Sequence, residues 1–300
     1  MTAKKRTWLV LALGCGCLLL LLAASAPSLV SHSVIQGTWH GSSKAFLPPS
    51  PEYELVSLRT TLGTKIIAQF GKAKGPKGEL LADYSRCPTV IYCYPGGGTL
   101  RWSAPQFEGF RRLGLNVIMP EYPGFGLSDG RPSESGCYQA AESVYDYILS
   151  RKDLDPGSLI AAGWSVGGGA ATDLACRHPL AGLILFGTST KLSDIGHYVA
   201  ANHPWLAWMP EWALERLTAE PKLDSVSKMP TVRCPILIVY GTKDPFVSKA
   251  MTEQLAAASK TRITVLPIDG AAHFDLFRAG GGRLWLSLAG WIVGACPQPG

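Results

Sequence analysis

Length, composition and charge already exclude several classes of protein. The chain has 300 residues, 47% hydrophobic and 17% charged, which is enough to bury a large core in one large domain or two small ones. The formal net charge is +6, but Lys4, Lys5 and Arg6 supply half of it, and no basic run indicates a nucleic-acid partner. No C-x-x-C pair or histidine cluster has metal-ligand spacing, so we expect no metal.

The N-terminus predicts a membrane segment. Residues 1–7 are basic, and residues 8–30 are an uncharged, mostly apolar run that is long enough to cross a bilayer. Ala24-Ser25-Ala26 resembles a signal cleavage site, but Pro27 disfavours a cut there, so we favour an uncleaved signal anchor. The basic end would stay in the cytoplasm. We therefore expect a single-pass membrane protein whose main domain is not cytoplasmic, or a secreted protein if the signal is cleaved.

The remaining chain predicts one α/β domain. Residues 31–51 resemble a linker rich in Gly, Ser and Pro, and residues 52–296 follow as the domain. Apolar, β-branched runs alternate there with helical patterns, which favours a mostly parallel central sheet with helices on both faces. The expected strands are residues 55–61 and 65–70 as a hairpin, then 89–94, 115–119, 158–162, 182–186, 235–240 and 262–266.

Residues 187–232 interrupt the alternation with aromatic residues and prolines. One interpretation is extra helices packed on the core. The other is a small helical cap that places aromatic side chains over a site for an apolar substrate. On the second interpretation, Trp205 and Trp208 bind substrate, together with Trp164 from the motif described next.

Residues 158–175 predict a nucleophile elbow. A short apolar strand leads into the G-x-S-x-G motif Gly163-Trp-Ser-Val-Gly167, and a helix rich in small residues follows. Glycines suit the positions flanking a serine at a sharp turn, and the helix directs free N–H groups toward the site where an oxyanion would form. A second match surrounds Ser128, but it follows a Pro/Gly-rich loop, so we expect Ser128 to be a turn residue. Ser165 is the expected nucleophile.

An elbow serine needs a base, an acid and an oxyanion hole. His273 lies in a Gly/Ala loop after the last predicted strand, and Asp244 follows the strand before it, which is the usual chain order of this machinery. Asp269 and Asp275 are rival acids, but both are very near His273 in sequence. The oxyanion donors are expected to be the N–H groups of Val166 and Gly97, with Gly98 as second choice.

These residues together resemble the α/β-hydrolase family of serine hydrolases, with the closer likeness to its membrane-tethered ABHD-type branch, related to S33-like peptidases. The resemblance covers about residues 55–292. One departure is Pro95-Gly96, where the family usually has His-Gly. The likeness is carried by Pro95-Gly-Gly97, Glu121-Tyr-Pro-Gly-Phe-Gly-Leu-Ser128, Gly163-Trp-Ser-Val-Gly167, Val232-Arg-Cys-Pro-Ile-Leu-Ile-Val-Tyr-Gly-Thr-Lys-Asp244 and Gly270-Ala-Ala-His273.

The resemblance implies an α/β-hydrolase fold and hydrolysis of esters, thioesters or lipid acyl groups. We therefore expect a membrane-anchored serine hydrolase that forms an acyl-enzyme on Ser165, needs no cofactor and takes an acyl ester or lipid-like small molecule. Two alternatives stay open, namely a serine peptidase of the S33-like type and a non-catalytic binding protein with a hydrolase fold.

Overall fold

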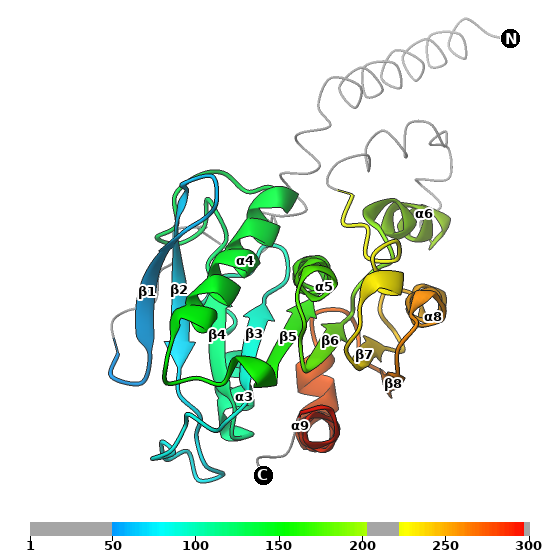
Figure 1. The fold of residues 1–300 in the computed structure, drawn as a ribbon. Helices are drawn as coiled ribbons and strands as arrows, with labels where there is room; N and C mark the ends of the chain where they lie inside the picture. Colours follow the sequence, from blue (N-terminus) through cyan, green and yellow to red (C-terminus); the bar gives the residue numbers. More distant parts are fainter. Residues whose placement is uncertain (1–49, 203–221, 297–300) are drawn as a thin grey trace, which may run out of the picture.

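An eight-stranded sheet forms the centre of the molecule. The computed structural model describes residues 50–202 and 222–296, drawn in colour in Figure 1. The strand order is β1-β2-β4-β3-β5-β6-β7-β8; the pairs β1–β2 and β2–β4 are antiparallel, and all other neighbours are parallel. The strands are β1 (Glu54–Arg59), β2 (Lys65–Gly71), β3 (Thr89–Cys93), β4 (Asn116–Pro120), β5 (Leu159–Trp164), β6 (Gly182–Phe186), β7 (Ile236–Gly241) and β8 (Ile263–Ile268).

Every strand expected from the sequence is present, and each boundary lies within a few residues of its predicted position. The apolar runs succeed as predictors because the central parallel strands are covered on both faces. All residues of β3, β4, β5, β6 and β7 are buried, so each of these strands reads as a continuous apolar run rather than an alternating one.

Helices cover both faces of the sheet. Helices α3 and α9 lie on one face, where Phe110 of α3 packs edge-to-face on Trp285 of α9 with centroids 5.4 Å apart. Helices α4, α5 and α8 lie on the other (Figure 1). The helices are α3 (Ala104–Arg112), α4 (Glu134–Ser150), α5 (Val166–Arg177), α6 (Leu192–Asn202), α8 (Lys249–Ala258) and α9 (Leu276–Ala295), with short 3₁₀ turns η1 (Pro156–Ser158) and η3 (Met229–Thr231).

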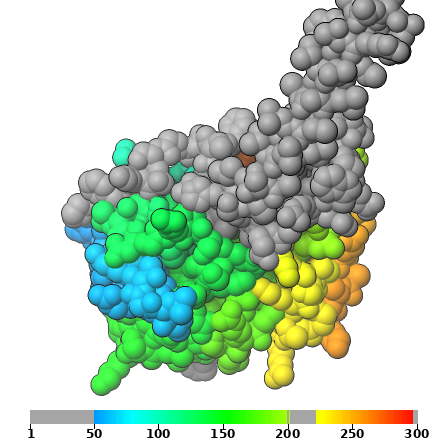
Figure 2. All heavy atoms as spheres, turned by 90° about the horizontal axis from the view of Figure 1, so that it is seen from above, coloured from blue at the N-terminus to red at the C-terminus, as the bar shows by residue number. Residues whose placement is uncertain are grey.

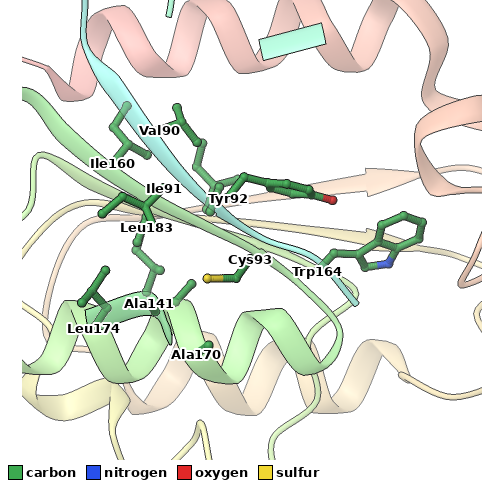
Figure 3. Packing of buried hydrophobic residues seen from close by; sticks show 14 of the residues in the cluster. Val90, Ile91, Tyr92, Cys93, Ala141, Ile160, Trp164, Ala170, Leu174 and Leu183 are labelled. Carbon is green, nitrogen blue, oxygen red and sulfur yellow. The ribbon is translucent and has the colours of Figure 1, made fainter. Parts of the chain in front are cut away.

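Successive side chains of a strand divide the core between the two faces. Figure 3 shows Cys93 pointing toward the side of Ala141 and Ala170, which belong to α4 and α5, while Tyr92 points the other way. There the Tyr92 ring packs on Phe110 of α3, with centroids 5.6 Å apart. The sheet is therefore fixed from both sides, and the loops that leave its strands start from rigid positions.

Residues 187–232, for which the sequence allows either extra core helices or a cap, connect β6 to β7. Helix α6 belongs to this insertion and lies above the carboxyl-terminal ends of the strands (Figure 1). Figure 2 looks onto this end of the molecule, with the β1–β2 hairpin and α4 on one side and the segments around β7 and α8 on the other. Residues 203–221 lie outside the described part, and Trp205 and Trp208 with them.

The predicted localisation requires a correction. In residues 50–202 and 222–296, no helix combines the length and the apolar character needed to cross a bilayer, and this finding stands against a single-pass membrane protein. The expected anchor, residues 8–30, and most of the expected linker lie outside the described residues.

Candidate active site

Ser165 sits on a strained turn between β5 and α5. Its φ is 54° and its ψ −118°, a region that side-chain-bearing residues rarely adopt. The Ser165 N–H donates to the Phe186 carbonyl at the end of β6, over 2.9 Å. A Cβ at Gly163 would overlap the Gly167 carbonyl, and a Cβ at Gly167 would overlap the Cys93 carbonyl. The glycines of the motif are thus required by the backbone contacts of the elbow.

His273 and Asp244 form a buried pair at the same end of the sheet. His273 Nδ1 lies 2.7 Å from Asp244 Oδ2, and the side chains are 4% and 0% exposed. The other carboxylate oxygen of Asp244 accepts the N–H groups of Phe246 and Val247, at 2.8 and 2.9 Å. This leaves His273 Nε2 as the ring nitrogen that is not engaged by the carboxylate.

The rival acids bond elsewhere. Asp269 accepts the Thr242 hydroxyl at 3.2 Å, and Asp275 accepts the Ala272 N–H and an Arg278 guanidinium, each at 2.7 Å. Of the three acids weighed from the sequence, only Asp244 is hydrogen-bonded to His273 among the described residues.

Gly187 connects the elbow to the buried pair. It directly follows Phe186, the residue that accepts the Ser165 N–H. A Cβ on Gly187 would lie 3.3 Å from His273 Nδ1 and 3.4 Å from Asp244 Oδ2. Phe186 and Gly187, at the exit of β6, therefore lie next to the Ser165 backbone and next to the His273–Asp244 pair, respectively. No hydrogen bond joins Ser165 to His273 in the described part of the chain.

The expected oxyanion donors lie in adjacent segments. Val166 is the first residue of α5, where helical N–H groups have no partner within the helix. Gly97 has a φ of +72° in the loop after β3, residues 95–99, which we call the oxyanion loop. Within that loop the Gly98 N–H donates to the Pro95 carbonyl over 3.0 Å, which favours Gly97 over Gly98 as the donor. The contact of Gly167 with Cys93 brings the two segments together.

Aromatic rings surround His273. Trp164 is 1% exposed and lies at the end of β5 (Figure 3), its ring stacked on Trp102 at 5.4 Å and 6.5 Å from the His273 ring. Trp164 is therefore a buried core residue near His273, and its role in substrate binding stays a prediction. Phe246 and Phe274 meet the imidazole edge-to-face at 5.3 and 4.9 Å and are 36% and 48% exposed.

Reasoning from the sequence missed these two phenylalanines. The signal that would have found them is their position, because Phe246 follows Asp244 by two residues and Phe274 directly follows His273. Both rings contact the imidazole of His273. They form the partly exposed apolar border of the site within the described residues.

Comparison with known proteins supports the fold. The family model for the alpha/beta hydrolase fold matches residues 88–217. An uncharacterized protein of Mycobacterium tuberculosis is 30% identical over 188 residues; this match spans 63% of each chain, less than two thirds of that relative's length. The alpha/beta hydrolase domain-containing protein WAV2 of Arabidopsis thaliana is 26% identical over 248 residues, 78% of this chain and 76% of that protein.

Solved structures agree with the family model. An esterase of Pyrococcus furiosus superposes with a TM-score of 0.68 at 14% identity, covering 84% of this chain and 96% of that one. A puromycin-hydrolyzing peptidase of Mycobacterium tuberculosis superposes with a TM-score of 0.63 at 19% identity, covering 83% of this chain and 42% of that one. The chain has the α/β-hydrolase fold, as the sequence motifs predicted.

Proposed function

We propose that this protein is a serine hydrolase that cleaves carboxylic esters or thioesters through Ser165, His273 and Asp244. The observation that carries the proposal is the buried hydrogen bond between His273 and Asp244, at the same end of the sheet as a serine held at positive φ. A buried carboxylate bonded to an imidazole, with a serine on a strand-to-helix turn at the same end of the sheet, matches the set of groups that acyl transfer uses. The α/β-hydrolase fold and its esterase neighbours agree with this chemistry.

The reaction would proceed in two steps, acylation of Ser165 and then hydrolysis of the acyl-enzyme. Ser165 Oγ attacks the acyl carbon while His273 Nε2 takes the hydroxyl proton, and the Val166 and Gly97 N–H groups stabilise the resulting oxyanion. The C–O or C–S bond then breaks, and the alcohol or thiol leaves with the proton from His273. Water repeats the sequence on the acyl-enzyme, releasing the acid and restoring Ser165. Each oxyanion donor contributes about 3 kcal/mol to lowering the barrier.

The test is covalent labelling of Ser165. A fluorophosphonate probe should label the wild-type protein and leave Ser165→Ala unlabelled. An adduct on Ser128 would instead assign the label to the second G-x-S-x-G motif. Intact-mass and peptide mapping would locate the adduct. Equal labelling of wild type and Ser165→Ala would exclude this nucleophile. An unlabelled wild-type protein would instead favour the non-catalytic binding alternative.

A peptidase activity is the second candidate, because one of the solved neighbours is a puromycin-hydrolyzing peptidase. The same triad would serve, with an amine as leaving group. A panel of short-chain and long-chain acyl esters, acyl thioesters and aminoacyl amides separates the two. We expect kcat/KM to be highest for esters or thioesters, and a clear preference for the amides would assign the peptidase function instead.

A further inference from the structure

The oxyanion loop is held by a residue that the triad does not include. We propose that Glu121 is a positioning residue, which fixes the oxyanion loop by accepting hydrogen bonds from the residues on both sides of it. This inference rests on the proposed function, since the position of the Gly97 N–H matters only if an oxyanion forms beside it.

One carboxylate oxygen joins the two ends of the loop. Tyr94 precedes the loop and Leu100 follows it. The Tyr94 hydroxyl donates to Glu121 Oε1 over 2.9 Å, and the Leu100 N–H donates to the same oxygen over 3.2 Å. Glu121 is only 2% exposed, so water does not compete effectively for these bonds. Without this acceptor, the Tyr94 hydroxyl and the Leu100 N–H both lose their hydrogen bond to Glu121, and the two ends of the loop are no longer joined through it.

The backbone of Glu121 is itself held firmly. Its N–H donates to the Ile67 carbonyl over 2.7 Å, and its carbonyl accepts the Ser128 hydroxyl at 2.9 Å. Ser128 Oγ in turn accepts the Ile67 N–H at 2.9 Å. The second G-x-S-x-G motif therefore has a structural purpose, because its serine anchors the segment that carries the glutamate to β2.

The exits of β3 and β4 are also joined directly. The Tyr122 N–H donates to the Tyr94 hydroxyl over 3.0 Å, and the Tyr122 hydroxyl donates to the Tyr94 carbonyl over 2.9 Å. The two rings pack with centroids 4.3 Å apart. Tyr94 is thus fixed at its backbone and its hydroxyl, and it transmits the position of Glu121 to the first residue of the loop.

The chain leaves space for this carboxyl group at Gly126. A Cβ at this residue would overlap Glu121 Oε2 and lie 2.8 Å from the carboxyl carbon. Gly126 also has a φ of +49°. The turn that follows Glu121 therefore leaves room for its carboxyl group.

The experiment compares Glu121→Gln with Glu121→Met. Glutamine keeps an acceptor oxygen at similar size, whereas methionine keeps the length without that oxygen. For ester hydrolysis we expect kcat of the Met variant to fall by about 10- to 100-fold with KM nearly unchanged, because loosening one oxyanion donor affects the transition state and not ground-state binding. The Gln variant should stay within about fivefold of wild type.

Controls separate positioning from general destabilisation. Leu288 of α9 is fully buried, in a helix that packs on β6, β7 and β8. Leu288→Ala should lower stability against urea without lowering kcat, when all variants are assayed where they remain folded. A Met variant with the kcat of wild type, or one that changes only KM, overturns the inference. If the wild type does not react with a fluorophosphonate at Ser165, the proposed function fails instead, which keeps the two failures distinct.

Discussion

The tautomer of His273 depends on a single carboxylate. Asp244 faces Nδ1 with one oxygen and accepts two backbone N–H groups with the other, so its orientation is fixed independently of the histidine. An Nδ1–H directed at this carboxylate leaves Nε2 with a lone pair, the form in which imidazole accepts a proton.

Replacing Asp244 with Asn tests this dependence. Its amide oxygen can keep the bonds to Phe246 and Val247, and its NH₂ group then faces Nδ1, so the proton moves to Nε2 and the base is lost. We expect kcat to fall by about 10³- to 10⁴-fold with little change in the urea midpoint. Asp269→Asn is the control, since this exposed residue bonds Thr242, and it should keep wild-type activity. Equal effects of the two changes would argue against the assignment.

At the residue scale, the sequence identifies candidate site residues where a short motif or a position after a predicted strand marks them. Ser165, Asp244 and His273 each follow a predicted strand, and the structure joins the last two by a hydrogen bond. The relation of Glu121 to Tyr94 and Leu100 had no such signal. It exists only because the fold places the exits of β3 and β4 side by side, and no spacing along the chain reveals that contact.

At the scale of elements, the close approach of α5 to the β6 exit depends on one glycine. A Cβ on Gly168 would overlap the Thr188 hydroxyl and lie 2.8 Å from the Thr188 Cβ. The next residue, Gly169, is different: its nearest neighbour would be a Leu223 methyl at 3.4 Å, an ordinary contact distance.

These two glycines give opposite predictions. Gly168→Ala should destabilise the protein by about 1–3 kcal/mol, since the added methyl overpacks a rigid contact. Gly169→Ala should stabilise it by about 0.5–1 kcal/mol, because alanine favours the helix and no neighbour must move. Urea unfolding of the two variants measures both changes. Similar effects of the same sign would contradict the packing described for α5.

The strands and helix α5 were predictable from different kinds of sequence evidence. Continuous apolar runs predicted the strands, because burial on both faces leaves little choice of residue type. The run of glycines at the start of α5 is a weak helix former on propensity alone, and it was assigned correctly because the elbow motif demands a helix there. The order of the strands in the sheet was not predicted, since register and neighbours depend on contacts across the whole domain.

At the scale of the whole molecule, burial of Glu121 links stability to pH. Burial raises the pKa of this carboxyl group from 4.5 to about 7, against the opposing effect of its bonds to Tyr94 and Leu100. Between these two values the folded protein keeps a proton that the unfolded chain has lost. Stability therefore falls as pH rises through this window.

The effect is measurable by urea unfolding at pH 5 and pH 7.5. Relative to Glu121→Gln, which does not titrate, the wild type should lose about 3 kcal/mol of unfolding free energy over this range. Other titrating groups contribute equally to both proteins and cancel in the difference. If the two proteins respond identically to pH, Glu121 does not hold its proton in the folded state as described.

The order of the candidate site residues along the chain has a consequence for translation of the protein. Ser165 follows β5, whereas Asp244 follows β7 and His273 follows β8. Ser165, the proposed nucleophile, is therefore translated long before His273, its proposed base. A nascent or truncated chain that ends before His273 carries a serine with no partner to activate it. Under the proposed mechanism, hydrolysis requires that β8 has joined the sheet, so activity would report the placement of this last strand.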